Sequence, residues 1–528
     1  MNRMLRLLRP RRLAAAFAVL VFLWTVARCW HPVYGFTAFL QYDEGHQATA
    51  IAAFREYPIF PYPGLAPYDG LQYSQLAYHP LLDAAELRPA VDSLAYRARR
   101  ILMPAAAWLL AAGQPAWIAE VYAVLNIAAW LLLAAVVWRR LPVTDTRGAL
   151  AWVGLLFSAG VMGSVRQALI DLPALLLLAL AVWDAERERN RRAAGWLAAA
   201  ALTRETSLLA AVARVPWPPK SRRDLGRGLL WALLAAAPLV LWLGYVHWRV
   251  GGTVEAGSRN FAWPVVGLLG KWSEGLRALA DPATAPFAWR SVLSTAALTC
   301  QAAFILIWRR PSSPWWRVGA VFAALLFCLG PAVWEGFPGA ASRVLLPLNL
   351  ACNVLAVRTR APLPWILACN LTVFSGLHVF HDLPPYQDLA AARHGRVAAL
   401  VVPGPGWFSA EHNSRHRWVW AESRGRLDLR AWPHADNIEV RLTLRAQGAT
   451  PRTIRALVAG REVWSGPLTQ RLSTIQLPPL VVTGGHLELE LSTDAPPVLE
   501  NSQANARRLG FMILDPTIAV SEAPSPVP

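Results

Sequence analysis

The chain is poor in charge, in lysine and in cysteine motifs. Only 16% of its 528 residues are charged, whereas soluble domains usually carry about a quarter. An ordinary cytosolic enzyme and a disordered chain are therefore excluded. Of the 51 basic residues only Lys220 and Lys271 are lysines. The five cysteines show no CxxC or Cys/His spacing, so neither a zinc site nor a disulfide framework is supported. The chain also contains no glycine-rich phosphate loop.

Hydrophobic residues are abundant instead. They make up 55% of the chain, which contains 26 tryptophans and has a mean hydropathy of +0.33. The net charge of +18 could indicate a nucleic-acid partner, but the arginines form short clusters beside apolar runs. That placement is typical of membrane proteins. We therefore expect a polytopic protein in contact with lipid, and no nucleic-acid partner.

Ten apolar runs are candidates for membrane segments. The first, residues 13–30, follows five arginines, and we interpret it as an uncleaved anchor rather than a signal peptide, with the N-terminus in the cytoplasm. The later runs are 116–138, 148–166, 168–183, 193–213, 228–248, 291–308, 317–334, 343–357 and 363–380. A shorter run at 101–113 predicts a helix at the outer interface.

The arginine clusters between these runs predict the orientation. They all lie on the cytoplasmic side only if 193–213 enters and leaves on the same side. The polar residues 203–206 near its middle predict the turn of a re-entrant hairpin, because irregular backbone is tolerated there when buried in protein. This gives nine full crossings, within a range of about nine to eleven membrane helices, and an external C-terminus. The expected location is the cytoplasmic (inner) membrane of a bacterium.

The C-terminal part of the sequence has a different pattern. Apolar and polar residues alternate at 426–431, 438–446, 454–458 and 486–491, with Gly and Pro between them. Short strands at this spacing predict an all-β sandwich outside the membrane. The predicted organisation is a mainly α membrane domain at 1–380, a linker at 381–394, a β-sandwich domain at 395–520 and a flexible tail at 521–528.

The first external loop, residues 31–115, carries most of the candidate chemistry. Asp43 and Glu44 follow the first run, and Asp69 stands in Tyr68-Asp-Gly-x-x-Tyr73. The cluster Arg97, Arg99 and Arg100 comes just before the interface helix. Arginine offers paired donors to phosphate oxygens, and a nearby carboxylate could take the proton of an acceptor hydroxyl. The alternative for the arginines is an interfacial belt.

These motifs carry a resemblance to the GT-C type of integral membrane glycosyltransferases, which take sugars from polyprenyl-phosphate donors. That group has an Asp-centred motif in the first external loop, which Asp43-Glu44 matches. The segment from Tyr68 to Pro104 resembles an uncharacterised bacterial branch in which the Asp69 motif itself is the acidic one. The resemblance implies Asp43 as the catalytic base in first place and Asp69 in second, with Glu44 beside them. It leaves open whether a divalent cation binds near Asp43.

Further positions fit the same resemblance. Asp171 and Glu205 match donor-site acidic residues, and Arg204 and Arg343 match residues that could bind the donor phosphate. Each has a structural alternative: Asp171 could cap a helix before Pro173, Arg204 and Glu205 could pair within the hairpin turn, and Arg343 could snorkel.

The predicted function is transfer of a sugar from a polyprenyl-phosphate donor to a glycan, lipid or protein acceptor of the cell envelope. The alternatives are a flippase or transporter of lipid-linked glycans and a non-catalytic scaffold for envelope assembly. The β domain could hold an acceptor glycan, with Trp407, Trp418 and Trp420 as candidate stacking residues, although a tryptophan in a sandwich more often belongs to the core.

Overall fold

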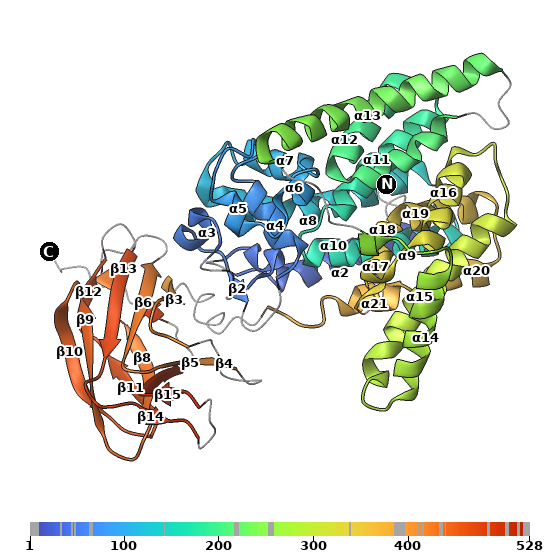
Figure 1. Ribbon diagram of the computed structural model, residues 1–528. Helices are drawn as coiled ribbons and strands as arrows, with labels where there is room; N and C mark the ends of the chain where they lie inside the picture. The colour runs from blue at the N-terminus through green and yellow to red at the C-terminus, as the bar shows by residue number, and fades with distance from the viewer. Residues whose placement is uncertain are drawn as a thin grey trace, which may run out of the picture.

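The computed structural model consists of a helical body followed by a β-sheet region (Figure 1). It describes residues 10–520 except for a set of short segments. These are 32–33, 44–45, 47–48, 63–66, 142, 216–220, 252–257, 337–338, 385–396, 409–410, 413–416, 432–436, 439, 483–485, 502–505 and 515–517. The predicted tail at 521–528 and most of the predicted linker lie outside the described residues.

The helical body is built from long apolar helices. Within the described residues, four stretches are long and apolar enough to cross a membrane: Pro115–Arg140, Thr146–Arg166, Arg222–Val250 and Ala285–Ile307. Shorter apolar helices span Leu13–Ala27, Pro314–Cys328 and Leu346–Arg358. Only 17% of the apolar window of the third stretch is buried inside the protein, as expected of a helix that faces lipid. The structure thus supports a membrane protein, while the count of nine crossings stays a prediction.

The helices begin at recognisable signals. Helix α9 (Thr146–Leu156) is capped by Asp145, whose carboxylate accepts from the amide of Gly148, and α13 (Arg222–Val250) is capped by the Ser221 hydroxyl. Proline occupies the first turn of α8 (Pro115–Arg140), α15 (Ala285–Ile307) and α16 (Pro314–Cys328). These residues satisfy or remove amide donors that a helix start leaves unpaired. Helix α10 (Ala159–Arg166) continues α9 after a break at residues 157–158.

The segment 190–214 forms the predicted hairpin. Helix α12 (Asn190–Thr203) forms the first arm of the hairpin, and Arg204 adopts an extended conformation at the turn. The 3-10 helix η3 (Glu205–Arg214) forms the second arm and packs beside α12. The guanidinium of Arg317 on α16 donates to the carbonyls of Val212 and Ala213 at the end of the return. The hairpin also packs on α11 (Asp171–Glu186) and α13. The turn of the hairpin, at Arg204 and Glu205, therefore lies at one end of the helical body, and the two ends of the hairpin, Asn190 and Arg214, lie at the other.

Two of the last predicted runs are divided. The predicted run at 317–334 is split into two helices: α16 ends at Cys328, and the short α17 (Pro331–Trp334) begins after Gly330. The run at 363–380 forms α20 (Leu363–Cys369) and α21 (Val373–His378). Between them, α18 (Ala341–Val344) precedes α19 (Leu346–Arg358). The amphipathic α14 (Val266–Ala280) lies before α15.

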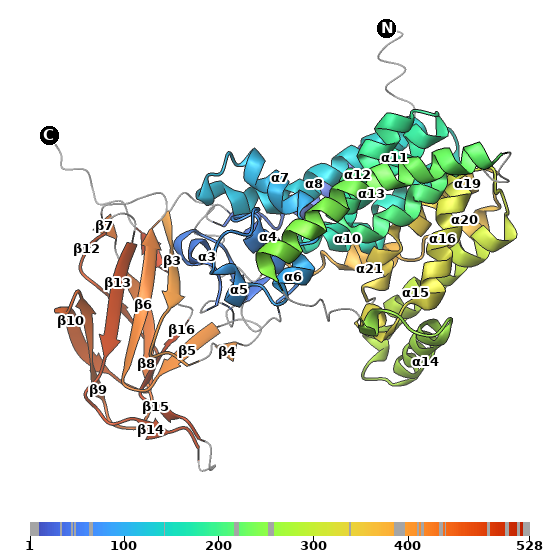
Figure 2. The same ribbon diagram turned by 45° about the horizontal axis from the view of Figure 1, so that its top comes forward.

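Residues 31–115, predicted to be the first external loop, are folded into short, packed elements. Strand β1 (Tyr42–Asp43) pairs in parallel with β2 (Pro61–Tyr62). The helices are α3 (Ala52–Glu56), α4 (Asp69–Leu76), α5 (Leu87–Ala90), α6 (Leu94–Arg97) and α7 (Leu102–Leu110). Residues 70–76 of α4 are all buried, and α7 occupies the predicted interface segment. The polar residues of this segment are thus attached to packed helices that lie beside the C-terminal half of α13 (Figure 2).

The C-terminal region forms two β-sheets, as predicted. One has strand order β10-β9-β13-β6-β3-β17 and the other β11-β8-β16-β5-β4. Apolar side chains of both sheets form one core, for example Leu429 and Leu489 from the first and Leu444 and Phe511 from the second. The strands of the two sheets are β3 (397–403), β4 (411–412), β5 (417–421), β6 (424–431), β8 (441–446), β9 (452–458), β10 (461–468), β11 (473–476), β13 (486–492), β16 (511–514) and β17 (518–520). Short pairs join β7 (437–438) to β12 (480–481) and β14 (498–499) to β15 (508–509).

Candidate functional site

A cavity of about 650 Å³ lies where residues 31–115 meet the hairpin turn and the segment around α18. Charged, aromatic and apolar side chains line it. Asp69 and Glu205 are among them, together with all five predicted phosphate-binding arginines, Arg97, Arg99, Arg100, Arg204 and Arg343. We call this space the acidic-arginine cavity. Residues separated by up to 275 positions in the chain contact each other there.

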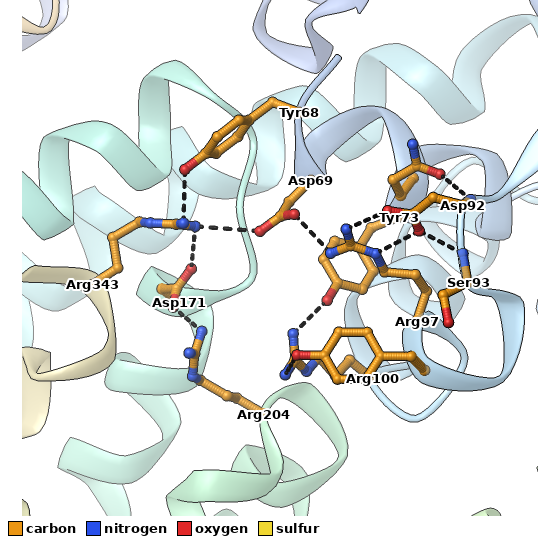
Figure 3. Close-up of polar contacts among 12 residues, drawn as sticks. Tyr68, Asp69, Tyr73, Asp92, Ser93, Arg97, Arg100, Asp171, Arg204 and Arg343 are labelled. Carbon is orange, nitrogen blue, oxygen red and sulfur yellow. Dashed lines mark hydrogen bonds and ion pairs between the residues drawn. The ribbon is translucent and has the colours of Figure 1, made fainter. Parts of the chain in front are cut away.

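Asp69 lies between two guanidinium groups (Figure 3). Its Oδ1 is 2.7 Å from Nη1 of Arg97, and its Oδ2 is 3.5 Å from Nη1 of Arg343. Asp92 holds Arg97 from the other side through two hydrogen bonds of 2.9 and 2.7 Å. Burial raises the pKa of Asp69, but Arg97 and Arg343 outweigh it and bring the pKa down to about 2. Asp69 is therefore ionised at neutral pH.

Asp171 connects two of the arginines. Its side chain is only 2% exposed, and it pairs with Arg204 through Oδ1 and with Arg343 through Oδ2, the latter at 3.4 Å. Asp171 stands in the first turn of α11, but Ile170 is the capping residue and no side-chain cap is formed. The capping alternative for Asp171 is thus wrong. Because Arg343 touches both Asp69 and Asp171, it links the loop to the helical body.

Arg100 and Glu205 form a separate ion pair at the same cavity. Nε and Nη2 of Arg100 each donate to one carboxylate oxygen of Glu205 at 2.8 Å. The hydroxyls of Tyr73 and Tyr96 accept from Nη1 and Nη2 at 2.7 and 3.0 Å. The alternative in which Arg204 and Glu205 pair only with each other is therefore wrong: each binds a residue outside the hairpin turn.

Tyrosines to which the sequence motifs assigned no role complete the polar wall. The hydroxyl of Tyr68 accepts from Nη2 of Arg343 at 2.7 Å, and Arg343 lies 5.2 Å from the centre of its ring. Burial raises the pKa of both Tyr68 and Tyr73, so both phenols stay protonated at neutral pH. Arg99 lies over the ring of Tyr96 at 5.7 Å. The spacing of Asp69 and Tyr73 was the available signal, since positions i and i+4 of a helix share a face.

Apolar side chains line the same cavity. They are Phe261, Leu325, Leu329, Val333 and Val344, and the polar Asn260 and Glu335 come from the same segments. A cavity lined by both guanidinium groups and hydrocarbon suits a ligand that has an anionic group joined to an apolar chain.

Gly70 explains why α4 can come so close to the helical body. A Cβ at this position would lie 2.3 Å from the backbone carbonyl oxygen of Gln167. Glycine is thus required for the close approach that places Asp69, one residue earlier, opposite Arg343 and near Asp171.

Asp43 and Glu44 are not part of this arrangement as described. Asp43 lies on β1, is 7% exposed and pairs with Nδ1 of His46 at 2.8 Å. It is not among the residues that line the acidic-arginine cavity. Glu44 lies outside the described residues. The structure therefore gathers the Asp69 motif with the predicted arginines and leaves Asp43 apart from them.

The described residues do not make a metal site at the cavity. In the part of the chain that the structure describes, no group of three or more His, Cys, Asp or Glu side chains is arranged to hold a metal ion. Asp69, Asp171 and Glu205 each face guanidinium groups instead. Glu44 lies outside the described residues, so a divalent cation near Asp43 stays a prediction.

The tryptophans of the β region divide between core and surface. Trp420 is 5% exposed and packs with Leu509 and Met512, and Trp407 packs edge-on against Phe511. Trp418 is partly buried and donates to Glu411 at 3.0 Å. Trp407 packs against the sandwich core, which favours the core interpretation for this residue. Trp418 and Trp420 lie on the face of β5 opposite to the core residues Val419 and Ala421, and both line a cavity of about 440 Å³.

Comparisons with known proteins do not establish a family. No protein-family model matches the chain, and no curated protein matches it. Among solved structures it is similar to the arabinosyltransferase EmbB from Mycobacterium smegmatis, with 12% identity and a TM-score of 0.27. The match covers 85% of this chain and 62% of that enzyme, so the chain spans less than two thirds of its length. A TM-score this low does not by itself establish a shared fold.

Proposed function

We propose that the protein is a membrane glycosyltransferase that moves a sugar from a polyprenyl-phosphate donor to a hydroxyl of an envelope glycan, lipid or protein. The observation that carries this proposal is the position of Asp69. This carboxylate faces Arg97 and Arg343 in a cavity that is also lined by apolar side chains. The arrangement supplies both a site for a lipid-linked phosphate and a base beside it.

The donor phosphate binds to the arginines. Guanidinium groups pair well with phosphate oxygens because their donors are planar and fixed. Arg97 and Arg343 already hold an anionic group, the carboxylate of Asp69, and Arg204 and Arg99 line the same space. The isoprenoid chain lies along the apolar side chains of the cavity, such as Phe261 and Leu329.

Asp69 acts as the general base once the donor is bound. Before the donor binds, its pKa of about 2 makes it a weak base. A phosphate that engages Arg97 and Arg343 supplies negative charge to the same guanidinium groups, which raises the pKa of Asp69. Donor binding and activation of the base are therefore coupled.

The transfer step is a displacement at the anomeric carbon. The acceptor oxygen forms the new glycosidic bond while its proton passes to Asp69. The bond between the anomeric carbon and the phosphate oxygen breaks, and the polyprenyl phosphate leaves with the bonding electrons. The configuration at the anomeric carbon is inverted. Asp171 and Glu205 are positioning residues, because they hold Arg204, Arg343 and Arg100.

A deletion strain complemented with variants tests the function whatever the transferred sugar is. Surface glycans and lipids are compared by mass spectrometry between the wild type, the deletion strain and strains that carry Asp69→Asn or Asp83→Asn. Asp83 is the matched control, since it lies in the same loop, is 59% exposed and does not line the cavity. We expect Asp69→Asn to lack the same sugar as the deletion strain and Asp83→Asn to restore it.

Two results would contradict the proposal. Accumulation of a complete lipid-linked glycan in the deletion strain would indicate a flippase. Full restoration by Asp69→Asn would show that its carboxylate is dispensable.

A further inference from the structure

A second cavity, of about 1120 Å³, lies at the other end of the same helices. Leu329, just after the C-terminus of α16, lines the acidic-arginine cavity, whereas Pro314 and Arg317 at its start line the second one. Likewise η3 contributes Glu205 to the first cavity and Arg214 to the second. We call this second space the arginine-end cavity. The proposed transfer reaction makes no use of it.

Its charge is predominantly positive and incompletely paired. Five arginines and three carboxylates line it: Arg214, Arg227, Arg310, Arg317, Arg358, Glu186, Glu188 and Asp224. Arg358 is paired with Glu186, and Arg317 donates to four backbone carbonyls.

Three arginines remain available to a ligand. Within the residues that the structure describes, the side chains of Arg227 and Arg310 have no hydrogen-bond or ion-pair partner. Nε of Arg214 is buried without one, while its guanidinium lies 5.6 Å from the centre of the Trp231 ring. A buried donor without a partner destabilises the protein, and an anion bound here would supply that partner.

Helix starts and helix ends both line the cavity. Asn190 is the first residue of α12, Pro314 is the first residue of α16, and Asp224 lies in the first turn of α13. The last residues of α11, η3 and α19, which are Glu186, Arg214 and Arg358, line it as well. Because the positive and negative ends of helix dipoles offset each other, the positive charge of the cavity comes from its arginines.

The cavity borders an apolar surface that faces outward. Arg227 and Trp231 line it on α13, and within two turns of Arg227 on that helix Leu230, Leu233 and Leu234 are 53%, 59% and 49% exposed. A tryptophan and arginines beside exposed leucines are typical of the boundary between lipid headgroups and acyl chains. A ligand in this place therefore meets cations and hydrocarbon together.

We propose that the arginine-end cavity binds the phosphate of an anionic phospholipid, with Arg214, Arg227 and Arg310 as its ligands. The acyl chains of that lipid lie along the exposed leucines of α13. Free phosphate offers the same anionic chemistry but has no apolar part that would contact the exposed leucines. The leucine surface therefore favours a phospholipid as the source of the bound phosphate.

Lipid retention measured by native mass spectrometry tests this site. Full-length protein is released from nanodiscs of phosphatidylcholine that contain phosphatidylglycerol, and the bound phosphatidylglycerol is counted. The test variant is Arg227→Gln combined with Arg310→Gln. The matched control is Arg309→Gln, because Arg309 neighbours Arg310, is exposed and does not line the cavity. Both variants change exposed residues, so the fold is retained.

We expect the double variant to bind phosphatidylglycerol about tenfold more weakly than the wild type, and Arg309→Gln to bind it normally. Equal retention by the double variant would overturn the proposal. An equal loss with Arg309→Gln would also overturn it, since general surface charge would then account for the binding. Displacement of phosphatidylglycerol by millimolar inorganic phosphate would assign the site to free phosphate instead. None of these outcomes depends on the transfer activity.

Discussion

The two cavities lie at opposite ends of α16 and are both rich in arginine, yet their arginines have different partners. At the acidic-arginine cavity, Arg97, Arg100, Arg204 and Arg343 each face a carboxylate. At the arginine-end cavity, Arg358 is the only one of the five arginines that forms an ion pair with a carboxylate among the described residues. Positive charge alone is thus common to both ends. The placement of Asp69, Asp171 and Glu205 among the arginines is what makes one end suitable for catalysis.

The largest expected effect comes from Arg343, which contacts both Asp69 and Asp171. Arg343→Gln removes a cation that binds the donor phosphate and leaves the buried Asp171 with one partner fewer. We expect the transfer rate to fall by about a hundredfold or more. The rate is measured with membranes from the complemented strain. Arg277→Gln serves as control, because Arg277 is exposed, bonds to Ser273 within its own helix and does not line the cavity; a comparable loss there would remove the special role of Arg343.

A second prediction concerns stability and uses the pair of Arg100 and Glu205. Arg100→Met leaves Glu205 without its bidentate partner and should lower the free energy of unfolding by about 3 kcal/mol. Adding Glu205→Gln removes the unpaired charge, so the double variant should be more stable than the sum of the single changes implies. Thermal unfolding in detergent measures both. Strict additivity would show that the pair contributes no coupling.

Gly70 tests whether the close approach of α4 positions the base. Gly70→Ala would place a Cβ against the carbonyl of Gln167 and push α4 away. We expect a loss of about 1–3 kcal/mol in stability and a lower transfer rate at unchanged protein levels. Gly163→Ala is the matched control, since a Cβ there meets no atom within 4 Å. Normal transfer by Gly70→Ala would show that the position of Asp69 tolerates this shift.

The smallest effect is expected at the other end. Glu186→Gln breaks a partly exposed ion pair with Arg358, so the change in stability should stay within about 1 kcal/mol. The freed arginine should increase the retention of phosphatidylglycerol at the arginine-end cavity. Native mass spectrometry measures the change, and a lower retention would contradict the proposed role of positive charge there.

Much of this arrangement could be predicted from local sequence signals. Arginine clusters predicted which helix ends lie together, and the polar residues 203–206 predicted the hairpin turn that brings Arg204 and Glu205 to the cavity. The β-sheet region followed from alternation of apolar and polar residues. Each of these signals depends on neighbours in the chain or on the direction of a helix.

The choice between Asp43 and Asp69 could not be made in that way. Both stand beside tyrosines in the same loop, and their spacing from the first run says nothing about which faces Arg343. The contact between Asp69 and Arg343 joins residues separated by 274 positions, and it depends on the packing of α4 against Gln167. Asp171 was likewise ambiguous, because a carboxylate in a first turn can cap the helix or reach a distant arginine.

The most direct test of the catalytic role of Asp69 compares Asp69→Asn and Asp43→Asn in the same transfer assay. Both substitutions keep the shape of the side chain and remove its capacity as a base. We expect a loss of about a hundredfold or more for Asp69→Asn and substantial activity for Asp43→Asn. Normal transfer by Asp69→Asn together with loss in Asp43→Asn would contradict this assignment and would move the catalytic base to Asp43.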